Sequence, residues 1–196
     1  RNTAPSITLA ALKAIEMEDD PILLILSSDH IIENEEQFIK VINCGIQYAS
    51  DDRLVTFGVI PDSPNTGYGY IKSETPLKGS VIEGSNVISF IEKPDIKTAN
   101  QFIKDERYTW NSGMFIFKAS TILKEVEKHC PKILEYCKES IEEKLFDLDF
   151  QRLNKNVFEE CPNISIDIAV MEKTNIGTVV PLDANWTDIG NWDAVW

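Results

Sequence analysis

The sequence predicts an open α/β sheet, in which helices and apolar strands alternate along the chain. Residues 22–26 and 54–60 are apolar runs of strand length, and each follows a segment that suits a helix. This alternation is typical of sheets whose strands are joined by right-handed crossovers. A chain of 196 residues can bury one sizeable core, so we predict a single domain over residues 1–196.

The first predicted helix covers residues 4–18, where Thr3 can cap the helix and Pro5 suits its first turn. A strand follows Pro21, and its continuous apolar run is typical of a parallel strand covered on both faces. Its polar tip is Ser27-Ser28-Asp29-His30. A second helix over 35–50 is expected from one apolar stripe, and the next strand covers 54–60.

The remaining elements are predicted in the following order. They are a loop over 61–80 with a short strand at 70–72, a strand at 87–94, a helix at 96–107, a strand at 112–118, helical segments over 119–145, a less regular stretch over 146–164, a short helix at 165–173, a strand at 176–182 and an aromatic tail at 186–196.

Composition excludes some classes of partner. The net charge is −13, from 32 acidic against 19 basic side chains, which leaves no basic stripe for nucleic acid. No apolar run approaches the roughly 20 residues of a membrane span. The four cysteines form no CxxC pair, so we expect scattered reduced thiols and a cytoplasmic protein.

Asp29 is the first candidate site residue, because ligands of open α/β sheets bind outside the carboxyl ends of the strands. A carboxylate there can hold Mg²⁺ against phosphate oxygens, although an ordinary loop Asp is an equally good reading. The neighbouring His30 is expected to be a hydrogen-bonded structural residue. Asp188 is the second candidate, since Trp186 and Trp192 suggest a walled carboxylate. The competing reading is an aromatic-rich core segment in which Asp188 caps a helix at Gly190.

Three further segments suit a sugar phosphate, and each is weak alone. In Gly67-Tyr68-Gly69 the glycines allow close backbone approach and the tyrosine offers a flat face. Glu92 can accept hydrogen bonds from hydroxyls, and Lys93 is a compact cation suited to a phosphate. Asn111 offers both a donor and an acceptor to vicinal hydroxyls. Arg1-Asn2-Thr3 precede a helix N-terminus, which favours anions.

Together these segments resemble the nucleotidyltransferase domain of bacterial mannose-1-phosphate guanylyltransferases. The resemblance covers the whole chain, through RNTAP, SSDHII, GVIPDSPNTGYGYI, FIEKPD, WNSGMFIFKA, SIDIAVMEK and WTDIGNWDAVW. It implies a Rossmann-like open mixed sheet of the sugar nucleotidyltransferase type, related to GT-A domains. The implied reaction joins GTP and mannose 1-phosphate into GDP-mannose and pyrophosphate, in the supply of precursors for polysaccharides.

The resemblance also implies residue roles. Asp29 and Asp188 resemble ligands of Mg²⁺, and Lys93 resembles the contact to the sugar phosphate. We expect these three to be the catalytic residues. The substrate contacts that the resemblance implies are Gly69, Glu92 and Asn111 on the mannose side, Arg1, Asn2 and Thr3 on the guanine side, Asp167 near the sugar, and Gly67 and Tyr68 without a more specific role.

One departure from the family is expected to matter. Its domains open on a strand and a glycine-rich GGxGxRLWPxS loop that cradles the triphosphate, and this sequence contains neither. We therefore expect little turnover from this chain alone, and an exposed strand edge that favours self-association into a homo-oligomer.

Three alternatives remain open. The first is another sugar nucleotidyltransferase, which joins glucose 1-phosphate to dTTP, UTP or ATP. The second is a non-catalytic regulatory relative that binds a sugar nucleotide. The third is a bifunctional protein with a phosphomannose isomerase portion beyond this chain.

Overall fold

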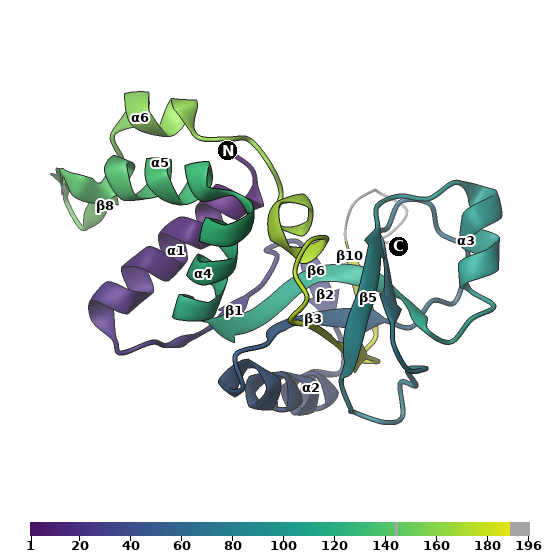
Figure 1. The fold of residues 1–196 in the computed structure, drawn as a ribbon. Helices are drawn as coiled ribbons and strands as arrows, with labels where there is room; N and C mark the ends of the chain where they lie inside the picture. The colour runs from purple at the N-terminus through teal and green to yellow at the C-terminus, as the bar shows by residue number, and fades with distance from the viewer. Residues whose placement is uncertain (144, 189–196) are drawn as a thin grey trace. The chain divides into compact units, whose positions relative to one another are not determined.

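The computed structural model describes residues 1–143 and 145–188, and the chain divides into two compact units (Figure 1). The first unit combines Arg1–Leu23 with Lys118–Thr174, and the second combines Leu24–Phe117 with the residues from Asn175 on. The single domain over 1–196 stays a prediction, and the two units are described separately below.

The first unit is mainly helical. Helix α1 (Thr3–Met17) packs against α4 (Ala119–His129) and α5 (Pro131–Glu142). Around them lie α6 (Lys155–Glu160), the π-helix η1 (Asp167–Met171) and a hairpin of β7 (Leu145–Asp147) and β8 (Phe150–Arg152). The predicted short helix at 165–173 is thus confirmed as a single π-helical turn.

The cap of α1 differs from the prediction. The side chain of Asn2, and not that of Thr3, accepts a hydrogen bond from the first helical N–H, at 2.8 Å. The Thr3 hydroxyl instead accepts a hydrogen bond from the backbone N–H of Ile166, at 2.9 Å. Thr3 therefore ties the start of α1 to the segment before η1.

A six-stranded sheet in the order β1-β6-β3-β9-β5-β4 makes up most of the second unit, and the boundary between the units falls within β1 and at the end of β6. Strands β3 and β9 are parallel, whereas β3–β6, β5–β9, β4–β5 and β4–β6 are antiparallel, so the sheet is mixed. This confirms the predicted α/β class. The strands are β1 (Ile22–Ile25), β3 (Leu54–Val59), β4 (Tyr70–Ser73), β5 (Ser85–Ile91), β6 (Tyr108–Lys118) and β9 (Gly177–Leu182).

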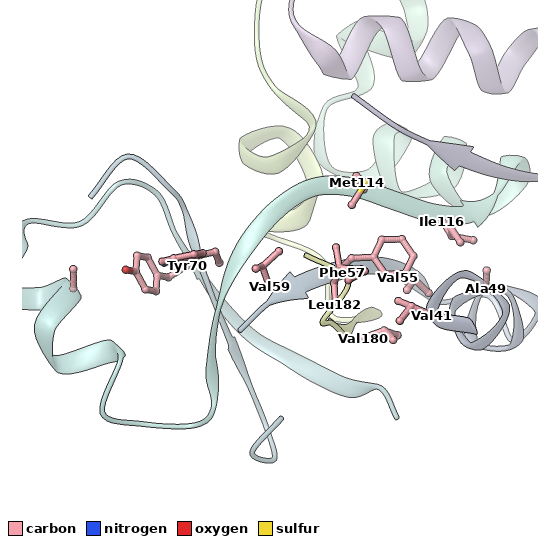
Figure 2. Packing of buried hydrophobic residues seen from close by; sticks show 13 residues of the cluster. Val41, Ala49, Val55, Phe57, Val59, Tyr70, Met114, Ile116, Val180 and Leu182 are labelled. Carbon is pink, nitrogen blue, oxygen red and sulfur yellow. The ribbon is translucent and has the colours of Figure 1, made fainter. Parts of the chain in front are cut away.

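Helix α2 (Glu35–Ser50) packs against β3 and β9 through the predicted stripe. Val41 and Ala49 are fully buried against strand residues such as Phe57 and Val180 (Figure 2). Gly45 allows a close approach here, because a Cβ at this position would lie 3.2 Å from the Phe57 ring, which is a tight contact. The helix thus fixes the two parallel strands whose ends carry the candidate site.

Strand β1 departs from the prediction, because it lies at the edge of the sheet and is not covered on both faces. Ile22 is 37% exposed and Leu24 is 41% exposed. An apolar run in the sequence indicates which side chains favour burial. It does not indicate whether a second strand pairs alongside and buries them. Within the described part of the chain, β6 is the one strand that pairs with β1.

Helix α3 (Ile96–Phe102) ends five residues before the predicted boundary at 107. Just beyond it, the Asp105 carboxylate accepts hydrogen bonds from the backbone and the guanidinium of Arg107. Such local side-chain bonds compete with helix continuation. No helix in the described ranges is both long enough and apolar enough to cross a membrane.

Candidate active site

The candidate site of the second unit lies past the ends of the parallel strands β3 and β9. Val59 pairs with Leu182 at that end of the register. The chain that leaves β9 forms β10 (Trp186–Asp188), which pairs antiparallel with β2 (His30–Ile32). In this register Asp188 lies opposite His30, the residue after Asp29. The fold therefore brings two candidate carboxylates, distant in sequence, to one imidazole.

His30 has the structural role expected of it. Its Nδ1 accepts a hydrogen bond from the indole N–H of Trp186, at 3.1 Å, and the two rings meet edge to face. Since an indole N–H can only donate, the neutral imidazole carries its proton on Nε2. Burial lowers the pKa of His30, against the opposing effect of the Asp29 and Asp188 carboxylates.

Tyr68 makes an interaction that the sequence did not predict. Its hydroxyl donates a hydrogen bond of 2.6 Å to Oδ1 of Asp188, while its ring packs against Trp110 at 5.0 Å and Trp186 at 5.6 Å between centroids. Burial and then the hydrogen bond to Asp188 raise the pKa of Tyr68. The sequence had suggested only a flat face for a ligand.

The expected mannose contacts gather beside Tyr68. The backbone carbonyl of Gly69 accepts a hydrogen bond from the N–H of Asn111, at 2.8 Å. A Cβ on Gly69 would lie 2.8 Å from Glu92 Oε2 and 3.7 Å from Asn111 Cβ. Gly67 lies in the turn that leads in, and its N–H donates to Asn65 Oδ1 at 2.7 Å. The structure thus brings together Gly69, Glu92 and Asn111.

Lys93 follows β5 in a strained backbone conformation. Its φ is +39°, in a region that L side chains other than Asn and Asp seldom adopt. The side chain is 65% exposed, and its Nζ lies 3.7 Å from Glu92 Oε1. An exposed ion pair of this length contributes little stability, so the lysine is available to an anion.

A cavity of 380 Å³ also lies at the ends of β3 and β9. Trp110 and Trp186 line it together with the carboxylates of Asp62 and Asp183. This volume is at the lower end of the range for small-molecule sites, which are commonly lined by aromatic rings and a few polar groups.

Four predicted site residues belong to the first unit and are therefore not placed against this edge. Arg1 donates from Nε to the Phe158 carbonyl, at 3.2 Å. The hydrogen bond between Thr3 and Ile166 brings the Arg1–Thr3 segment close to Asp167, which follows Ile166 and begins η1. Within that unit, the segment predicted to lie on the guanine side and the predicted sugar-side Asp167 are thus neighbours.

The two carboxylates fit the Mg²⁺ that the sequence predicts. Mg²⁺ is usually held by one or two carboxylates plus substrate phosphates and waters, and less often by a cage made of protein alone. Asp29 is exposed and Asp188 is half-buried, and both offer only oxygen. Across the described residues, no group of three or more His, Cys, Asp or Glu side chains is arranged so that it could hold a metal ion by itself.

The model of the nucleotidyl transferase family matches residues 1–196. The chain belongs to this family. Mannose-1-phosphate guanylyltransferase from Klebsiella pneumoniae is 46% identical over 196 residues, which are all of this chain and 42% of that protein. The chain therefore spans less than half of the nucleotidyl transferase relative that it matches.

Two solved structures resemble this nucleotidyl transferase chain closely. One, from Thermus thermophilus and described as a mannose-1-phosphate geranyltransferase, has a TM-score of 0.84 and 30% identity over 99% of this chain and 54% of its own. The other, from Helicobacter pylori and described as a mannose-6-phosphate isomerase, has a TM-score of 0.81 and 37% identity over 95% of this chain and 70% of its own. Both confirm the predicted fold.

Proposed function

We propose that the protein containing this chain transfers GMP from GTP to mannose 1-phosphate and so forms GDP-mannose and pyrophosphate. The observation that carries the proposal is the pairing of β10 with β2. It supports a carboxylate pair, Asp29 and Asp188, at the edge where Gly69, Glu92 and Asn111 gather. The 46% identity to a protein of that name across the whole chain supports the choice of substrates.

In the proposed reaction, a phosphate oxygen of mannose 1-phosphate attacks the α-phosphorus of GTP. A new P–O bond forms, the bond to the bridging oxygen breaks, and pyrophosphate leaves with the electron pair. No covalent enzyme intermediate is needed, so the protein contributes mainly alignment and charge neutralisation. Bound Mg²⁺ would neutralise phosphate charge, with Asp29 and Asp188 as its protein ligands.

The remaining residues would hold the substrates. Glu92, Asn111 and the backbone around Gly69 would bond to mannose hydroxyls, and Lys93 would contact the sugar phosphate. Gly67 and Tyr68 would shape the same pocket. Arg1, Asn2 and Thr3 would lie on the guanine side, with Asp167 closer to the sugar.

Pyrophosphate release by the full-length protein tests the substrates. GTP with mannose 1-phosphate should exceed every pairing of UTP, dTTP or ATP with glucose 1-phosphate by at least about tenfold in kcat/KM, equivalent to about 1.4 kcal/mol. A preference for another pair would identify a different sugar nucleotidyltransferase. The 196-residue chain alone should turn over negligibly, because its sequence contains no glycine-rich triphosphate loop.

The Asp188→Asn variant tests the metal carboxylate in the full-length protein. It should lower kcat by about 10²–10³-fold, the loss usual for one electrostatic group at a reacting phosphate or carbonyl. Asp149→Asn, in the exposed turn between β7 and β8, is the matched control and should be unchanged. If wild type and Asp188→Asn bind GDP-mannose equally and neither turns over, the protein is a sugar-nucleotide sensor.

The Helicobacter pylori structure favours one second candidate, because it is described as an isomerase. The whole protein would then also interconvert mannose 6-phosphate and fructose 6-phosphate, through a portion beyond this chain. A coupled assay for fructose 6-phosphate on the full-length protein tests this. We also propose a cytoplasmic location, which the four free cysteines support.

A further inference from the structure

The hydrogen bond between Tyr68 and Asp188 suggests a role for Tyr68 other than binding the sugar. The phenol donates to a carboxylate oxygen at 2.6 Å, a length typical of charge-assisted O–H···O⁻ bonds, which are about twice as strong as neutral ones. The donor and the acceptor are 120 positions apart, so neither belongs to the other's local turn.

The position of the phenol is itself fixed by packing. Its ring packs against both Trp110 and Trp186, with centroids 5.0 Å and 5.6 Å away. Trp186 is held in turn by its hydrogen bond to His30, the residue next to Asp29. The contacts from Tyr68 to Trp186 and from Trp186 to His30 therefore connect Asp188 with the neighbour of Asp29.

The bond uses one oxygen of Asp188 and leaves the other. Among the residues that the structure describes, Oδ1 is bonded to Tyr68, and no hydrogen bond to Oδ2 is formed. A carboxylate anchored through one oxygen presents the second in a fixed direction. Partners of this kind orient metal ligands in proteins, and their loss typically costs 10–100-fold in metal affinity.

We propose that Tyr68 is a positioning residue, whose hydroxyl holds Asp188 for divalent-cation binding. This inference rests on the proposed function, because it takes Asp188 as a cation ligand. It assigns the ring of Tyr68 to the aromatic wall of the site and the hydroxyl to the carboxylate. The alternative is that Tyr68 contacts the substrate directly, as the sequence suggested.

Tyr68→Phe separates these roles, because it removes the hydroxyl and keeps both ring contacts. The full-length protein would be titrated with Mn²⁺, with the free ion followed by electron paramagnetic resonance. Tyr68→Phe should weaken the Kd for Mn²⁺ by about 10–100-fold. Tyr48→Phe is the control, since its hydroxyl bonds to Gly84 and should leave that Kd unchanged.

Two further measurements extend the test. The first does not depend on activity, and the second shows whether the variant is correctly folded. Cation binding to wild type should change the ultraviolet absorption of a tyrosine, and Tyr68→Phe should lose that change. Raising the Mg²⁺ concentration should restore kcat in Tyr68→Phe, because weakened cation binding can be overcome by mass action. The KM for mannose 1-phosphate should stay within about twofold of wild type.

The outcomes distinguish this inference from the proposed function. If Asp188→Asn weakens Mn²⁺ binding but Tyr68→Phe does not, only the inference is overturned. If Tyr68→Phe raises the KM for the sugar phosphate and leaves the Mn²⁺ affinity unchanged, the inference is likewise overturned, and Tyr68 is a substrate contact. If Asp188→Asn also binds Mn²⁺ like wild type, the cation site fails, and this inference fails with it.

Discussion

At the scale of single residues, Gly69 shows how closely the chain approaches the proposed sugar site. Its absent side chain leaves room for Glu92 Oε2, which would lie 2.8 Å from a Cβ at this position. The carboxylate ends a flexible side chain that is 48% exposed, so it can move away at little cost to the fold. The same movement would take it from the position in which it meets a sugar hydroxyl.

Gly69→Ala should therefore affect binding more than stability. We expect the KM for mannose 1-phosphate to rise about tenfold, because small misplacements of binding groups have large kinetic effects. The melting temperature should stay within about 4 °C of wild type. Steady-state kinetics and thermal unfolding of the full-length protein check both, and an unchanged KM would contradict the expectation.

At the scale of elements, Gly58 lies where β3 is held between β6 and β9. The register of β3 against β6 shifts between Thr56 and Gly58. A Cβ at Gly58 would overlap the Thr109 hydroxyl and lie 2.8 Å from Val179 Cγ2. Both neighbours are fully buried strand residues.

Gly58→Ala should consequently lower the free energy of unfolding by about 1–3 kcal/mol, the usual cost of overpacking a core. Denaturant unfolding of the chain measures this loss. Gly67→Ala is the comparison for stability alone, because its Cβ would meet only Asn65 Oδ1, at 3.1 Å, in an exposed turn. Equal stabilities for the two variants would contradict the packing argument.

Helix α4 contains a buried glutamate, Glu125, whose ionisation makes the stability of the folded chain depend on pH. Glu125 is 7% exposed, and it accepts hydrogen bonds from Thr174 Oγ1 at 2.6 Å and from Lys128 Nζ at 3.3 Å. Burial alone would raise the pKa of Glu125, but these bonds and the nearby charges of Lys128 and His129 lower it below the ordinary value.

A carboxyl whose pKa is depressed by folding stabilises the folded state above its unfolded pKa. That stabilisation is present above about pH 4.5, and it should be lost as the pH falls through the lower folded value. Glu125→Gln should flatten this acid dependence in thermal melts between about pH 3 and 7, with a loss of about 1–3 kcal/mol at neutral pH. The exposed Glu127→Gln should leave it unchanged.

The sequence was informative about elements with local patterns and less so about their partners. The apolar stripe over 35–50 and the apolar run over 54–60 predicted α2 and β3 closely, because the spacing of apolar residues depends on which positions of the element are buried. The edge position of β1, the pairing of β10 with β2 and the partner of Tyr68 depend on distant contacts. No local spacing encodes those contacts. The part of the tail from Ile189 to Trp196, which contains the helix start considered at Gly190, lies outside the described residues.

At the scale of the whole molecule, the apolar edge at β1 favours self-association of the 196-residue chain. Ile22 and Leu24 on β1, and Leu26 just after it, are 37–51% exposed. An edge strand with exposed apolar side chains is a template for pairing with another chain. We expect the chain to sediment as dimers or larger species as its concentration rises.

Leu24→Lys should shift that equilibrium towards the monomer, because charged edge residues oppose strand pairing. Sedimentation velocity over a tenfold range of concentration, with Leu148→Lys in the exposed β7–β8 turn as control, measures the shift. A monomeric wild-type chain across that range would contradict the expectation.

At Lys93, with its left-handed backbone, stability of the fold and binding of the phosphate favour different residues. Such a conformation costs a lysine about 1–2 kcal/mol, and glycine avoids this cost while losing about 0.5–1 kcal/mol of its own in chain entropy. Lys93→Gly should thus leave the fold as stable as wild type or slightly more so, while removing the proposed phosphate contact. A library screened for heat resistance would accept glycine at this position, and the same library screened for turnover would return lysine.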